Sequence, residues 1–122
     1  MSETRGEFAR RRERGNERLL DGAPLPIKRF FALDQDVYAS GALPKKTKEL
    51  LGLVASTVLR CDDCIAYHIH EAMDAGATRD EQIEALAVAL VVGGSITIPH
   101  LRFAARLLDG EESADGGTSA DD

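Results

Sequence analysis

The chain has 122 residues, which is long enough for one domain with a substantial hydrophobic core. Its formal net charge of -6 comes from the last fourteen residues, DGEESADGGTSADD, which contain six acidic side chains and no basic one; the rest has 15 residues of each sign. The acidic balance therefore says little about partners, and the lack of any run of about 18 apolar residues excludes a membrane-spanning helix.

The first predicted element is a charged helix that ends near Asp21–Gly22. Its sequence, TRGEFARRRERGNERLL, has six arginines by Arg18, and three glutamates are interleaved with them, with a fourth, Glu3, just before this stretch. A nucleic-acid-binding arm is one interpretation, but mixed charges are typical of an exposed helix with salt bridges. We favour the exposed helix and expect no nucleic-acid partner. No positively charged start precedes an apolar run and a cleavage site, so we expect a cytoplasmic protein.

Two more helical segments are predicted before residue 60. The extended segment APLP leads into the first of them, from Ile27 to Ser40. Pro44 suits the first position of the next helix, where a missing amide hydrogen costs nothing. The apolar residues of that helix recur at spacings of three, four and seven, which predicts a core-facing stripe. The stripe consists of Leu50, Leu51, Val54, Ala55 and Val58.

The fourth and fifth helices have clear local signals at their ends. The fourth is predicted to start near Cys61 and to end at Gly76, a favourable helix C-cap. Thr78 and Glu81 form a capping box that opens the fifth helix. After Glu84 this helix is apolar nearly all round, so we expect it to be central or to pack against another subunit.

The last predicted helix runs from about Ser95 to Leu108, after a break at Gly93-Gly94. Pro99 is compatible with this helix only near its first turn. The strongest β-like run, ALVVGGSITI, is interrupted by the two glycines and followed by the proline. The sequence therefore predicts an all-α, oligomeric protein of about six helices.

Three parts are predicted along the chain. Residues 1–43 form an N-terminal helical extension, residues 44–108 form the helical core, and residues 109–122 form an acidic tail. The tail has low hydrophobicity, glycines and like charges, which cannot repay the entropy of ordering, so we expect it to be disordered.

Both cysteines and two of the three histidines lie within RCDDCIAYHIHEA, which raises the question of a metal site. At about 100° per helical residue, Cys61, Cys64 and His68 share one face, whereas His70 points the opposite way. A structural zinc site requires four ligands in a tetrahedron, and this helix offers three at most. We therefore expect no metal, and we expect His70 to lie at the surface or at an interface.

The same residues are typical of a redox site. A Cys-x-x-Cys pair at the start of a helix suits disulfide formation, and the N-terminal amides favour thiolate. His68 lies one turn beyond Cys64 and is able to accept its proton. In an antiparallel hairpin that turns near Arg60, Glu49 lies roughly 15 Å from the turn and His68 about 12 Å, at about 1.5 Å per residue. Glu49 is then either a buried partner of His68 or an ordinary exposed glutamate among lysines.

The chain contains a motif that resembles that of the alkylhydroperoxidase D (AhpD)-like proteins of the carboxymuconolactone decarboxylase superfamily. The motif consists of Glu49, eleven intervening residues, Cys61-x-x-Cys64 and His68. The segment that follows, EAMDAGATRDEQIEALAVALVVGGSITIPH, is similar to the next helices of that superfamily. The resemblance covers about residues 44–108. It implies an all-helical subunit that assembles into trimers or hexamers.

The resemblance also implies a dithiol peroxidase of the peroxiredoxin type, with an external thiol or dithiol as reductant and with neither flavin nor metal. The family residue that matches Cys64 attacks the hydroperoxide, and the one that matches Cys61 resolves the sulfenic acid to a disulfide. The residues that match Glu49 and His68 relay the proton.

This chain differs from AhpD at Asp63, because AhpD has a histidine immediately before the second cysteine. Asp62 and Asp63 place two carboxylates beside the thiols, and nearby negative charge disfavours thiolate. Acidic residues are also common in the first turn of a helix because they interact favourably with its dipole. The sequence does not decide between these two interpretations.

Two other functions stay open at this point. One is acid–base catalysis by Glu49 and His68, of the kind that the decarboxylases of the superfamily perform without a cysteine pair. The other is a non-catalytic helical oligomer, since cysteine is among the most buried residue types.

Overall fold

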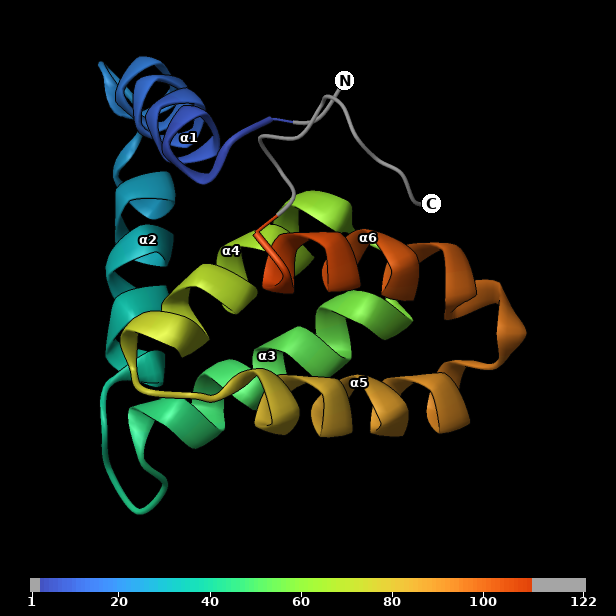
Figure 1. Ribbon diagram of the computed structural model, residues 1–122. Coiled ribbons are helices and arrows are strands. Elements are labelled where there is room, and N and C mark those ends of the chain that lie inside the picture. Colours follow the sequence, from blue (N-terminus) through green and yellow to red (C-terminus); the bar gives the residue numbers. More distant parts are fainter. Residues whose placement is uncertain (1–2, 111–122) are drawn as a thin grey trace. The chain divides into compact units, whose positions relative to one another are not determined.

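The computed structural model describes residues 3–110, and every regular element in this range is helical (Figure 1). The prediction of an all-α protein of about six helices with the cysteine pair at a helix N-terminus is confirmed. None of the helices within 3–110 is long and apolar enough to cross a membrane. The predicted acidic tail lies outside the described residues from position 111 onward. The elements are α1 Arg5–Leu20, α2 Leu25–Tyr38, α3 Lys45–Val58, α4 Asp62–Asp74, α5 Arg79–Gly93, the 3-10 helix η1 Ser95–Thr97 and α6 Ile98–Leu108.

Most helix ends follow the local signals in the sequence. The capping box of Thr78 and Glu81 is present at the start of α5. Gly76 follows the end of α4 with a φ of 95°, a conformation that glycine adopts without steric cost. Pro44 is the N-cap of α3 and not its first residue. The last helix begins later than predicted, at Ile98, because Ser95–Thr97 forms the 3-10 turn.

The described chain divides into two units, residues 3–39 and residues 40–110. The first unit contains α1 and α2. Arg11 of α1 forms an ion pair of 2.9 Å with Glu3, which precedes the helix, and also lies over the Phe8 ring. The second unit contains α3 to α6 and both cysteines.

In the second unit, α3 and α4 form an antiparallel hairpin, and α5 runs alongside α3 (Figure 1). An ion pair of 3.1 Å joins Lys46 to Glu81 near the starts of α3 and α5, and Gly93 lies against Val58 near their ends. Helix α6 packs against α4 and α5. This arrangement encloses a buried apolar cluster of Leu53, Ile65, Ile69, Leu86 and Ala104.

The predicted core-facing stripe of α3 is wrong. Leu51 is 55% exposed and Ala55 is also exposed, whereas the buried residues of α3 are Glu49, Gly52, Leu53, Ser56 and Thr57. The prediction failed because the buried face carries a carboxylate, two hydroxyls and a glycine. A search for apolar periodicity does not detect a face of that composition.

Helix α5 is not central, which removes one of the two interpretations of its apolar sequence. Leu86 and Ala89 face the core, but Val88, Val91 and Val92 are 53%, 85% and 68% exposed. A helix that is apolar nearly all round therefore leaves one apolar face uncovered in the single chain.

Candidate active site

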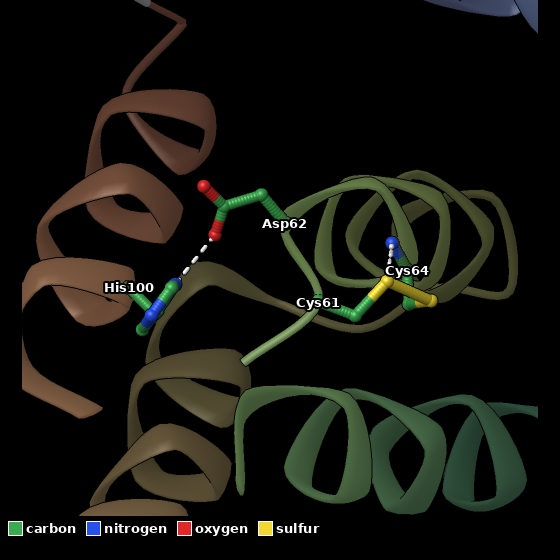
Figure 2. Close-up of a disulfide and its surroundings, with 4 residues drawn as sticks. All are labelled: Cys61, Asp62, Cys64 and His100. Atoms are coloured by element: carbon green, nitrogen blue, oxygen red, sulfur yellow. Dashed lines mark hydrogen bonds and ion pairs between the residues drawn. A yellow bond between two sulfur atoms is a disulfide. The ribbon is translucent and has the colours of Figure 1, made fainter. Parts of the chain in front are cut away.

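The cysteine pair lies where α4 begins. Cys61 is the N-cap residue of α4, and its Sγ accepts a hydrogen bond of 3.2 Å from the backbone N–H of Cys64. The two residues form a disulfide, with their Cα atoms 5.2 Å apart (Figure 2). Cys64 is exposed, whereas Cys61 is partly covered. The pair therefore lies at the surface, with Cys64 as the more exposed residue.

A tight turn between α3 and α4 sets the position of Cys61. Arg60 has a φ of 61°, the left-handed region that residues with a side chain rarely adopt. The N–H of Arg60 donates to the carbonyl of Thr57, and the N–H of Cys61 donates to the carbonyl of Ser56, both at 3.0 Å. These bonds reverse the chain within a few residues, so that α4 starts directly where α3 ends.

This hairpin brings Glu49 and His68 into contact, as the spacing predicts. Glu49 Oε1 lies 2.8 Å from His68 Nδ1. The Glu49 side chain is fully buried and His68 is 9% exposed. An ionised carboxylate only accepts hydrogen bonds, so Nδ1 of His68 is the donor in this contact. Cys64 precedes His68 by four residues on α4, which places the two side chains on neighbouring turns of one face.

Lys45, one of the lysines near Glu49 in the sequence, is a further member of this site. Its Nζ lies 2.7 Å from Glu49 Oε2 and 3.5 Å from Glu71 Oε1. The two oxygens of the Glu49 carboxylate are thus divided between His68 and Lys45. The spacing of four between Lys45 and Glu49 was the available signal, because such pairs meet on a helix.

The surroundings of Glu49 keep its carboxylate charged. Burial acts to raise the pKa of Glu49, but hydrogen bonds from His68 and Lys45 outweigh it, and the net pKa is lowered. The bond to Glu49 in turn raises the pKa of Lys45. The site therefore holds a buried anion that orients His68.

Two further features of α4 are not given by spacing along the chain. His70 is only 9% exposed in the single chain, so it does not lie at the free surface, and its place at an interface stays a prediction. Helix α4 contacts both α3 and α6, and its buried arc is consequently wider than one stripe. Asp62 accepts a hydrogen bond of 2.7 Å from His100 Nδ1 of α6, a contact that sequence spacing does not reveal (Figure 2).

The arrangement is suited to thiol chemistry. It combines an accessible cysteine pair, a helix N-terminus that stabilises negative charge, and a histidine oriented by a buried carboxylate. Within residues 3–110, no three or more histidine, cysteine or acidic side chains are placed to bind a metal ion together.

Solved structures of other proteins resemble this fold, and two of them illustrate the similarity. A carboxymuconolactone decarboxylase family protein of Thermotoga maritima, for which involvement in an antioxidative response is suggested, is 53% identical, with a TM-score of 0.81 over 88% of this chain and 92% of that one. A protein of the same family from Legionella pneumophila is 26% identical, with a TM-score of 0.78 over 86% of this chain and 94% of that one.

A curated relative and a family model agree with these structures. The protein of Paracoccus denitrificans named uncharacterised protein 4 in cox locus is 36% identical over 80 residues, which are 66% of this chain and 72% of that protein. The model of the carboxymuconolactone decarboxylase family matches residues 24–107, a range that includes the cysteine pair and the Glu49–His68 contact. On this match and on the shared helical architecture, the chain belongs to the carboxymuconolactone decarboxylase family.

Proposed function

We propose that this protein is a thiol-disulfide oxidoreductase that reduces hydroperoxides through Cys64 and Cys61. The observation that carries the proposal is the position of an accessible cysteine pair at the start of α4, one turn before a histidine bonded to a buried glutamate. A suggested antioxidative role of the Thermotoga maritima relative supports it.

In the proposed reaction, the Cys64 thiolate attacks the outer oxygen of the hydroperoxide. The S–O bond forms as the O–O bond breaks, which yields a Cys64 sulfenic acid and an alkoxide. His68, after taking the thiol proton through Nε2, returns a proton to the alkoxide, while Glu49 stabilises the imidazolium. Cys64 is assigned the attack because it is the more exposed residue of the pair.

The second step forms the disulfide. The Cys61 thiol displaces water from the Cys64 sulfenic acid, and the 5.2 Å separation of the Cα atoms is within the range of disulfides. An external thiol or dithiol then reduces the disulfide and is itself oxidised. One cycle consumes one peroxide and two reducing equivalents.

Mass spectrometry of the reduced protein after one equivalent of hydrogen peroxide tests this reaction. We expect the wild type to lose about two daltons, as one disulfide requires, and a dimedone adduct to form in the Cys61→Ser variant only. No mass change within minutes would contradict the peroxidase proposal. Glu49 and His68 would then have to be tested as an acid–base pair for another substrate.

We also propose that the protein is a homo-oligomer, a trimer or a hexamer. The uncovered apolar face of α5, with Val91 85% exposed, supports this proposal because such a face is costly in water. Light scattering is expected to give a mass that is a multiple of 13.2 kDa, and Val91→Glu is expected to reduce it. A wild-type monomer at micromolar concentration would contradict the proposal.

A further inference from the structure

The first turn of α4 contains a charged residue that is bonded to another helix. Asp62 is the first residue of α4 and follows Cys61 directly. Its Oδ1 lies 2.7 Å from His100 Nδ1, on α6. Figure 2 shows the Asp62 carboxylate directed towards His100, while the sulfurs of Cys61 and Cys64 lie on the other side of the α4 start.

The position of His100 is unusual for a histidine. It is the third residue of α6, where a positive charge interacts unfavourably with the helix dipole. Its side chain is only 22% exposed, whereas that of Asp62 is 50% exposed. The interaction with Asp62, and not the dipole of α6, accounts for a histidine at this place.

The bond holds in both charge states of the imidazole. A carboxylate only accepts, so Nδ1 of His100 is the donor whether the ring is neutral or protonated. Asp62 would otherwise be a carboxylate in the first helical turn, where acidic side chains turn towards the same N-terminal amides that stabilise a Cys61 thiolate. A carboxylate in that position would disfavour the thiolate.

The other ionisable groups near this turn come from several elements. Arg60 precedes Cys61 in the α3–α4 turn, and Asp63 follows Asp62 on α4. His68 of α4 is bonded to Glu49 of α3. The ion pair of Glu81 on α5 with Lys46 lies near the start of α3, at the opposite end of the α3–α4 hairpin from this turn. From α6, His100 contacts the start of α4 through its bond to Asp62.

We propose that His100 is a positioning residue of the dithiol site, which holds the Asp62 carboxylate away from Cys61 and Cys64. The thiolate that forms after reduction then benefits from the α4 N-terminus without this negative charge beside it. The inference rests on the proposed function, because it concerns the acidity of the same cysteine pair. It also resolves the two interpretations of Asp62: its charge suits the helix dipole and is kept from the sulfurs.

The test is the pH dependence of alkylation of the reduced full-length protein by iodoacetamide, with the modified cysteine identified by peptide mass. His100→Leu introduces an apolar side chain of similar volume and removes the N–H donor. We expect this substitution to raise the pH midpoint of alkylation by about half a pH unit to one pH unit. Well below the midpoint, this corresponds to roughly three- to tenfold less thiolate. His100→Asn retains an N–H donor and is expected to stay close to the wild type.

A double-mutant cycle separates this effect from loss of packing. In the Asp62→Asn background, His100→Leu is expected to leave the midpoint unchanged. In the Asp63→Asn background, which removes the neighbouring charge instead, the shift is expected to persist. An unchanged midpoint in His100→Leu, or a shift that survives Asp62→Asn, would overturn the proposal.

Folding of each variant is checked by far-UV circular dichroism. If His100→Leu does not fold, Asp62→Asn alone decides. Because the Asp62 carboxylate is held away from the sulfurs, the pH midpoint of alkylation in Asp62→Asn is expected to stay close to that of the wild type, and a lowering by about half a unit or more would overturn the proposal. Alkylation requires no peroxide. If the midpoints shift as expected but the protein does not react with peroxide, only the peroxidase proposal is contradicted. Cysteines that are not alkylated at any pH would overturn both.

Discussion

Replacement of Cys64 by serine is expected to lower the rate of peroxide reduction by roughly 10³-fold or more, because a serine hydroxyl has no accessible anion at neutral pH. Cys61→Ser is expected to keep one rapid turnover and then to stop at the sulfenic acid. Serine is a favourable N-cap, so α4 should start normally in this variant. Stopped-flow peroxide consumption with one and with ten equivalents measures both effects.

The opposite pattern would assign the attack to Cys61. Its sulfur already accepts the N–H of Cys64 at the start of α4, a bond that stabilises negative charge on sulfur. If Cys64→Ser retained the single turnover and Cys61→Ser lost it, this bond would outweigh the greater exposure of Cys64. The measurement therefore decides which property of the site governs the order of the two steps.

Glu49→Gln is expected to slow peroxide reduction by roughly 10²-fold, since His68 loses the carboxylate that stabilises its imidazolium. The variant is also expected to be less stable at pH 7 by about 1–3 kcal/mol, because Lys45 loses a charged, buried hydrogen-bond partner. Peroxide consumption and urea unfolding measure these effects. An unchanged rate would exclude Glu49 from the proton relay.

The stability difference between wild type and Glu49→Gln should depend on pH. The pKa of Glu49 is lowered in the folded protein from a reference value of 4.5, because the bonds from His68 and Lys45 outweigh burial. Its carboxylate therefore contributes fully above about pH 4.5, and the contribution is lost as the pH falls through the folded pKa. We expect the two unfolding free energies to converge below pH 4.5.

Glu84→Gln is the matched control for this pH series. Glu84 is an exposed residue of α5 in the same unit of the chain. Its substitution is expected to change the free energy of unfolding by no more than about 0.5 kcal/mol at any of these pH values. A convergence of equal size in Glu84→Gln would assign the effect to general charge and not to the buried glutamate.

The Glu49–His68 contact shows how far sequence spacing reaches. A tight turn fixes the register of two neighbouring helices, so residues at similar distances from the turn meet, as these two do. The same arithmetic says nothing about Lys45, whose importance depends on the burial of Glu49. It also says nothing about His100, because α6 reaches the start of α4 through contacts between elements distant in sequence.

The sequence by itself determined the helices and most of their ends, the cysteine pair at the start of α4 and the register of the α3–α4 hairpin. These features depend on interactions within a few residues or across one short turn, such as the Thr78–Glu81 capping box and the left-handed Gly76. Only the tertiary structure decided which face of α3 is buried, where His70 lies and what Asp62 contacts. Those outcomes depend on which helices pack together, and polar groups buried on an inner face leave no apolar period to detect.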